Sequence, residues 1–276
     1  MILKMVSYVV LGFFVGGFGT LIGAGGGFLL TPVLLILFPD MPAQSVTAIS
    51  MTTVFFNSVS GSLAYARMKR IDFKTGLIFA AAALPGTVIG TLLTSVTPRR
   101  LFDTIFGGCM VLFALLIFMK SRIGDHHAEY DKLGIFRAQR IFTDRDGTQT
   151  AFSFNLLAGV FISIGVGFLS GFLGIGGGIV HVPALIFLGF PAHFATATSH
   201  FVLACSSFTG FAVHLFSGAL NHNELLAFGI AAGAVAGAQV GAVISKKVKG
   251  SAIMICLAAA LILAGARILV TGILGK

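Results

Sequence analysis

The sequence predicts an all-α polytopic membrane protein with two related halves, and three observations support this prediction. Only 10% of the 276 residues are charged, against about 25% in a soluble globular protein, and the mean hydropathy is +1.01. Apolar runs of about 20 residues, the length that crosses a bilayer as a helix, recur along the chain. A glycine-rich phrase at Gly23–Ile36 also returns at Gly174–Phe187, 151 residues later. Cell-membrane localisation with several spans follows.

Eight apolar runs are long enough to span a bilayer as helices: Met5–Ile22, Ala43–Tyr65, Thr75–Val96, Leu101–Met119, Phe152–Phe172, Ala192–Phe216, Leu225–Ser245 and Ala252–Ile273. Two shorter apolar pieces, Phe28–Phe38 and Ile179–Phe190, would each reach only about 16–18 Å as helices, roughly half the bilayer. Each short piece follows a glycine cluster. We therefore expect a glycine-broken or re-entrant hairpin in each half, accompanied by about three transmembrane helices.

The domain organisation predicted from this pattern has three parts. Residues 1–119 form a first transmembrane repeat, residues 120–150 a polar linker, and residues 151–276 a second transmembrane repeat. Cationic loops of membrane proteins face the cytoplasm, so the linker and the loop Arg67–Lys74 are expected there. The formal net charge of +9 fits cationic loops better than nucleic-acid binding.

The repeat extends beyond the glycines. Thr47–Ser50 matches Thr196–Ser199 at an offset of 149 residues, and Pro85–Gly90 matches Ala236–Gly241 at an offset of 151. An odd number of crossings in each half makes the repeats inverted, and an even number makes them parallel. The distribution of Lys and Arg between the two sides of the membrane is equally uneven in both arrangements, so it does not distinguish inverted from parallel repeats. We favour inverted repeats, because a half-length limb in each half suits two hairpins that meet at the midplane.

These motifs resemble the TauE/SafE family of sulfite and organosulfonate exporters, also called the toluene-sulfonate uptake permease family. The family shows a Gly-x-Gly-Gly-Gly cluster followed by proline in each half. This chain has both copies: Gly23–Gly27 with Pro32, and Gly174–Gly178 with Pro183. The family's Thr-Ser pair is kept as Thr198-Ser199, whereas Ile49 replaces the threonine in the first half. The resemblance implies export, or uptake in some members, of small sulfur-containing or carboxylate anions.

The glycine clusters are the first candidate substrate site. Consecutive glycines allow a tight turn that exposes backbone N–H groups, and a helix that starts just after them adds the positive end of its dipole. Such a cradle binds oxyanions without an arginine in the membrane. The candidate residues are Gly25, Gly26, Gly27, Gly176, Gly177 and Gly178. The alternative is close helix packing, which we expect for the scattered pairs Gly86/Gly90 and Gly237/Gly241.

Polar side chains in two apolar runs are the second candidate layer. Ser50, Thr53 and Asn57 have the spacing i, i+3, i+7, which places them on one helix face. Thr198, Ser199 and His200 lie on the corresponding run of the second half. The alternative for each hydroxyl is a hydrogen bond to its own helix backbone or to a neighbouring helix.

No Asp or Glu lies in the middle of any predicted span, which argues against a carboxylate cation site or proton relay. The ionisable candidates are His181, His200 and His214, and His200 is favoured because it follows Thr198-Ser199. Catalytic residues, a metal and cofactors are not expected. The expected partners are a small anion and the lipid bilayer, without nucleic acid, and a homo-oligomer stays open. The alternative functions are a proton-coupled anion uptake permease, a non-transporting membrane scaffold and an intramembrane enzyme.

Overall fold

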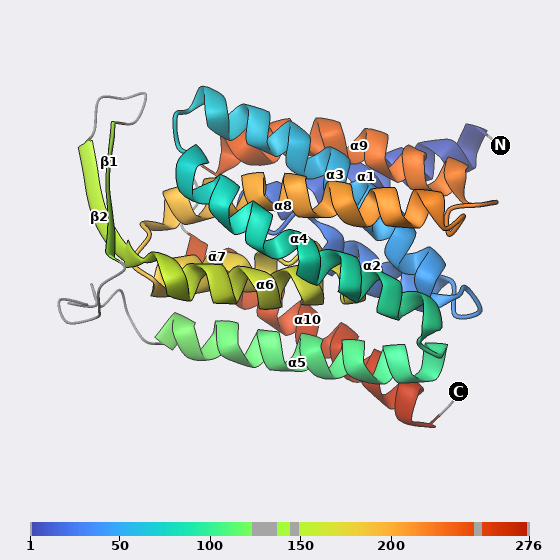
Figure 1. Cartoon of the computed structure of the whole chain (residues 1–276). Coiled ribbons are helices and arrows are strands. Elements are labelled where there is room, and N and C mark those ends of the chain that lie inside the picture. The colour runs from blue at the N-terminus through green and yellow to red at the C-terminus, as the bar shows by residue number, and fades with distance from the viewer. Residues whose placement is uncertain (1, 123–136, 144–148, 246–249, 275–276) are drawn as a thin grey trace.

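The computed structural model describes residues 2–122, 137–143, 149–245 and 250–274, which form ten helices and one two-stranded β hairpin (Figure 1). The first group of elements is α1 (Ile2–Ile22), α2 (Gly27–Leu37), α3 (Ala43–Arg67), α4 (Phe73–Val96) and α5 (Arg99–Arg122). The hairpin consists of β1 (Arg137–Thr143) and β2 (Gln149–Asn155). The second group is α6 (Leu156–Leu173), α7 (Gly178–Phe187), α8 (Ala192–Phe216), α9 (Glu224–Ile244) and α10 (Gly250–Leu274).

Helix length and composition show a multi-pass membrane protein. Within the described residues, α1, α4, α6, α8 and α9 are each long and apolar enough to cross a bilayer. Helix α3 has 25 residues but carries many Ser and Thr side chains that are buried inside the protein. Large apolar side chains cover the outside instead; Leu3 and Phe216, for example, are 84% and 89% exposed. This distribution suits a lipid environment, in which apolar side chains need no burial.

The predicted helices agree with the observed ones apart from the segment around the hairpin. Residues 137–155 contain two antiparallel strands, so the prediction of a purely helical chain was wrong at this point. The predicted span Phe152–Phe172 starts too early, since α6 begins at Leu156 and Phe152 belongs to β2. The ring of Phe152 packs 4.8 Å from that of Phe190. The pairing of β2 with β1 and this ring contact join residues that are distant in the sequence, so the local sequence does not show them.

Local capping explains where two of the long helices begin. The side chain of Asn155 accepts the N–H of Ala158 at 3.1 Å and caps α6. Asp72 accepts the N–H of Thr75 at 3.1 Å and caps α4 in the same way. Such caps satisfy backbone donors that the first helical turn leaves unpaired.

The helices pair across the two groups. Helix α1 packs along α9, α6 packs along α4, α5 packs along α10, and α3 and α8 pack on each other. Glycines make two of these contacts close: a Cβ atom at Gly90 would lie 2.2 Å from the carbonyl oxygen of Phe168, and one at Gly237 would lie 2.1 Å from that of Phe13. The predicted packing role of the pairs Gly86/Gly90 and Gly237/Gly241 is confirmed.

The molecule has two distinct ends, which we name the hairpin end and the termini end (Figure 1). The hairpin end holds the β hairpin and the α3–α4 loop, joined by an ion pair of 3.0 Å between Arg140 Nε and Asp72 Oδ2. The termini end holds the start of α1, the end of α10 and the α8–α9 loop (Figure 1). There Gln44 Nε2 donates to Ser217 Oγ at 3.3 Å. The α3–α4 and α8–α9 loops therefore lie at opposite ends.

Candidate functional site

Two glycine breaks with the same backbone conformation lie inside the helical bundle. In the first break, the φ angles of Gly23, Gly25 and Gly26 are +82°, +76° and +82°. In the second, the φ angles at the corresponding positions are as follows: Gly174 +67°, Gly176 +78° and Gly177 +71°. Glycine adopts these left-handed angles without the Cβ clash that other residues meet. The repeated glycine phrase therefore encodes the same turn twice.

Each break turns the chain back beside the helix that precedes it. The N–H of Ala24 donates to the Gly19 carbonyl oxygen at 2.8 Å, and a Cβ atom at Gly26 would lie 2.8 Å from the Val15 carbonyl oxygen. In the second break, a Cβ atom at Gly177 would lie 2.8 Å from the side chain of Val166. Helices α2 and α7 thus begin inside the bundle, with Gly26 and Gly177 as their N-caps.

The two breaks touch each other in this conformation. A Cβ atom at Gly27 would lie 2.8 Å from the Gly174 carbonyl oxygen, and one at Gly178 would lie 2.5 Å from the Cα atom of Ala24. The Val54 side chain packs against both breaks, at Gly25 and Gly176. The N-terminal ends of α2 and α7 are therefore neighbours, and an anion placed between them requires that the breaks separate.

The backbone donors at these two helix ends are buried and unpaired. Within the part of the chain that the structure describes, the N–H groups of Gly26, Gly27, Gly177 and Gly178 have no hydrogen-bond acceptor, and all four residues are buried. Water normally satisfies such donors at exposed helix ends. Here they present partial positive charge to the protein interior, which is the chemistry of an anion site.

A polar cluster, Thr20, Asn57, Tyr65 and His200, lies one helical turn before the first break. Thr20 Oγ1 donates to Asn57 Oδ1 at 3.3 Å and lies 3.3 Å from His200 Nε2. Tyr65 Oη donates to the Thr20 carbonyl oxygen at 2.8 Å. Two atoms of the cluster, Asn57 Nδ2 and His200 Nδ1, have no hydrogen-bond partner among the described residues. Leaving a buried polar atom unpaired costs about 1–3 kcal/mol, so these two atoms are candidates for ligand contact.

Small residues make room for this cluster. A Cβ atom at Gly16 would lie 2.7 Å from Asn57 Oδ1, and one at Gly61 would lie 2.5 Å from His200 Nε2. In the second half, Gly210 makes room in the same way for the Met51 side chain, with 2.2 Å from a Cβ atom to Met51 Cε. Met51 thus occupies beside Gly210 the place that His200 occupies beside Gly61.

The other predicted side chains have protein partners. Ser50 Oγ donates to the Gly174 carbonyl oxygen at 2.5 Å and so supports the second break, although it lies in the first half. Thr53 Oγ1 donates to the Ile49 carbonyl oxygen of its own helix at 3.0 Å. Own-helix bonding, the alternative considered for these hydroxyls, therefore holds for Thr53.

The three consecutive candidates Thr198, Ser199 and His200 point in different directions. Thr198 Oγ1 accepts the N–H of Asp72 at 3.1 Å, whereas Ser199 Oγ lies 3.3 Å from His181 Nδ1. Successive residues of an α-helix are about 100° apart around its axis, so the three cannot face one ligand together. Of the six predicted polar side chains, the structure brings together only Asn57 and His200 at the first break.

Thr20 and Tyr65 are the cluster residues that the sequence analysis missed. Thr20 is a hydroxyl residue three positions before Gly23, and the stretch Val9–Ile22 is otherwise apolar, so its position was the signal available. His181 was named as an ionisable candidate; its Nε2 lies 3.3 Å from Ser163 Oγ. It is fully buried between Ser163 and Ser199.

The helical bundle with two buried, glycine-broken hairpins defines a multi-pass membrane transporter. The chain belongs to the TauE/SafE family, because the family model "Sulfite exporter TauE/SafE" matches residues 8–268. It is 35% identical to the probable membrane transporter protein YunE of Bacillus subtilis, over 98% of this chain and 99% of that protein. It is also 32% identical to the probable membrane transporter protein MJ0441 of Methanocaldococcus jannaschii, over 75% of this chain and 71% of that protein. No solved structure matches it.

Proposed function

We propose that the chain exports a small oxyanion, namely sulfite, an organosulfonate or a related carboxylate. The observation that carries this proposal is the pair of buried helix N-termini with unpaired N–H groups, at Gly26–Gly27 and Gly177–Gly178. Sulfite, sulfonate and carboxylate groups all present acceptor oxygens to such donors. The family's description as sulfite exporters supports the same class of substrate.

The proposed substrate contacts are the backbone of Gly25–Gly27 and Gly176–Gly178, together with Asn57 and His200. The unpaired atoms of these two side chains support this choice. Thr20 then acts as a positioning residue, since its hydroxyl lies between the two side chains. Ser50, Thr53, Thr198 and Ser199 are proposed to act through the structure rather than by touching the anion, since each lies within hydrogen-bond distance of another protein group.

We further propose that residues 1–119 and 151–276 are inverted repeats. The equal left-handed turns of the two breaks support a duplication. The crossed pairing of α1 with α9 and of α6 with α4 is the pattern expected from a twofold relation. The corresponding α3–α4 and α8–α9 loops lie at opposite ends of the molecule (Figure 1), which favours an odd number of crossings in each half. Rocking of one half against the other would then open the contact between the breaks to each side in turn.

Single cysteines test this topology. On a background in which Cys109, Cys205 and Cys256 are replaced, we expect Glu224→Cys to react with a membrane-impermeant thiol reagent in intact cells. Arg67→Cys should react only after permeabilisation, since its loop is expected in the cytoplasm. Both positions are exposed at helix ends. Parallel repeats predict that both cysteines stay unlabelled in intact cells, so that result would overturn the inverted arrangement.

Export of the anion and its proton-coupled uptake differ in the driving force that each requires. Moving one negative charge out of a negative-inside cell gains about 2.3 kcal/mol at 100 mV, so export needs no coupling ion. Proton-coupled uptake is the second candidate, favoured by the buried His181 and His200, whose ring nitrogens lie within 3.3 Å of hydroxyl groups. Histidine is the side chain suited to carry a proton near neutral pH.

Flux in proteoliposomes decides between the two. We expect radiolabelled sulfite to follow an imposed membrane potential at equal pH and to ignore a pH gradient at zero potential. Flux that follows the pH gradient and disappears in His200→Gln would establish proton-coupled uptake instead. Protein-free liposomes measure the leak of the anion through the lipid, which is subtracted. The absence of flux of sulfite, taurine and acetate under every gradient would contradict the proposed function as a whole.

A further inference from the structure

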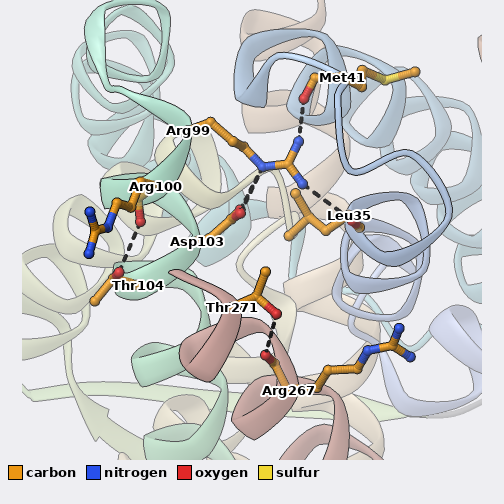
Figure 2. A network of polar contacts seen from close by, with 8 residues as sticks. All are labelled: Leu35, Met41, Arg99, Arg100, Asp103, Thr104, Arg267 and Thr271. Carbon is orange, nitrogen blue, oxygen red and sulfur yellow. Dashed lines mark hydrogen bonds and ion pairs between the residues drawn. The ribbon is translucent and has the colours of Figure 1, made fainter. Parts of the chain in front are cut away.

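A cavity at the termini end lies about two helical turns along α2 from the first glycine break. Its volume is about 560 Å³, and it is bounded by the end of α2, the start of α5 and the end of α10. The polar side chains that line it include Arg99, Arg100, Asp103 and Arg267 (Figure 2). Three arginines in one place are unusual in a mostly apolar bundle. The hydrogen bonds of each arginine show whether its charge is already compensated by the protein.

The guanidinium of Arg99 is bonded to protein acceptors through all three of its nitrogen atoms. Its Nε donates to both oxygens of Asp103, at 2.8 and 2.9 Å. Its two terminal amino groups donate to the carbonyl oxygens of Leu35, at 3.2 Å, and of Met41 (Figure 2). These bonds fasten α5 to the end of α2. The charge of Arg99 is compensated by Asp103, which is its ion-pair partner.

Arg100 fastens the opposite wall. Its Nε donates to the Gly272 carbonyl oxygen at 3.0 Å, and one terminal amino group donates to the Ile273 carbonyl oxygen at 2.6 Å. Both acceptors belong to the last turn of α10, where helical carbonyls lack intrahelical donors. Arg100 thereby closes α5 onto α10 but has no carboxylate partner in the described part of the chain. Its positive charge is not neutralised by the protein there.

Of the three arginines at the cavity, Arg267 is the one whose guanidinium has no acceptor among the described residues. The dashed line at Arg267 in Figure 2 joins its backbone carbonyl oxygen to the Thr271 hydroxyl at 2.9 Å, and no bond of the guanidinium to a described residue is present. Seven residues separate it from the end of α10 at Leu274, which is about 10 Å along the helix axis. Its neighbours Leu263 and Val270 are exposed apolar side chains. Arg267 is itself exposed on this face of α10, and an arginine near a helix end extends its guanidinium toward the membrane interface, where anionic groups lie.

We propose that this cavity binds an oxyanion group, with Arg267 as its cationic ligand. Guanidinium groups match phosphate and sulfonate oxygens in geometry and form strong charge-assisted hydrogen bonds. Arg100 is not part of this site, because its guanidinium is bonded to the end of α10 and points to the opposite side from that of Arg267 (Figure 2). The oxyanion is either a free sulfonate- or phosphate-like ion or the phosphate of a membrane lipid, which share this chemistry. This proposal concerns binding alone and does not require that the chain transports the bound anion.

Binding of two probes to the purified full chain tests the proposal. The first is radiolabelled inorganic sulfate with delipidated protein in an uncharged detergent. The second is phosphatidylglycerol, counted by native mass spectrometry after reconstitution in mixed phosphatidylcholine and phosphatidylglycerol. We expect Arg267→Gln to weaken the binding of one probe at least tenfold. This guanidinium has no hydrogen bond to a described residue, so the variant should fold and melt like the wild type. Arg67→Gln, an exposed cation at the hairpin end, should bind like the wild type.

The pattern of losses identifies the source of the oxyanion. Weaker sulfate binding establishes a site for free ions, whereas loss of retained phosphatidylglycerol alone establishes a lipid phosphate site. Equal binding of both probes by wild type and Arg267→Gln would overturn the proposal. An equal loss in Arg67→Gln would overturn it as well, because the effect would then reflect overall charge. Neither probe measures transport, so failure here is distinct from failure of the proposed export.

Discussion

Alanine at Gly26 or Gly177 is expected to reduce anion flux at least tenfold, and valine at either position is expected to abolish it. Both glycines have left-handed φ angles, +82° and +71°, in which an L side chain costs roughly 1–2 kcal/mol. A Cβ atom at Gly26 would also lie 2.8 Å from the Val15 carbonyl oxygen, so α2 must move. That movement displaces the N–H groups that we propose as the anion cradle.

The measurement is flux of radiolabelled sulfite per amount of folded protein in proteoliposomes, with the melting temperature recorded for each variant. Gly165→Ala and Gly108→Ala are the matched controls, because nothing lies within 4 Å of a Cβ atom at either helical position. Both should transport like the wild type. Gly90→Val should lower the melting temperature through its contact with α6 while the remaining folded protein still transports. Wild-type flux in both Gly26→Val and Gly177→Val, with normal expression, would refute the glycine site.

The second large effect is expected at His200. His200→Met should reduce flux at least tenfold, because it removes the unpaired Nδ1 atom that we propose to contact the anion. The melting temperature should stay the same or rise, since a buried atom without a partner is removed. Methionine is already accommodated at the corresponding place, where Met51 packs against Gly210. Thr20 keeps its bond to Asn57.

Steady-state flux kinetics and thermal unfolding on the same preparations check this expectation. Asn57→Leu should behave in the same way, with the loss mainly in the apparent affinity for the anion. Thr52→Val is the matched control, because the buried Thr52 hydroxyl is bonded to the Ala48 carbonyl oxygen of its own helix at 2.8 Å. A drop in melting temperature with unchanged flux per folded protein in His200→Met would show that the histidine is structural.

The location of the helices and of both breaks could be predicted because their causes are local. Apolar runs of bilayer length become helices in any fold that spans a membrane, since backbone groups in lipid must be paired within the segment. The glycine clusters mark positive φ angles because other residues are strained there. The hairpin at residues 137–155 was missed because Phe152 and Phe154 are apolar like the helix that follows. Their contact with Phe190, at 4.8 and 4.5 Å between ring centroids, belongs to tertiary structure.

By itself, the sequence determined a helical membrane protein with two glycine-broken hairpins, because hydropathy and glycine conformation act over a few residues. Only the tertiary structure decided which polar side chains meet. The bond of Thr198 to Asp72, the bond of Ser50 to the second break and the bonds of Arg99 to Leu35 and Met41 each depend on the segment that packs opposite. The physical reason is that a hydroxyl, an amide or a guanidinium can bond to many partners, and packing alone brings one of them within hydrogen-bond distance.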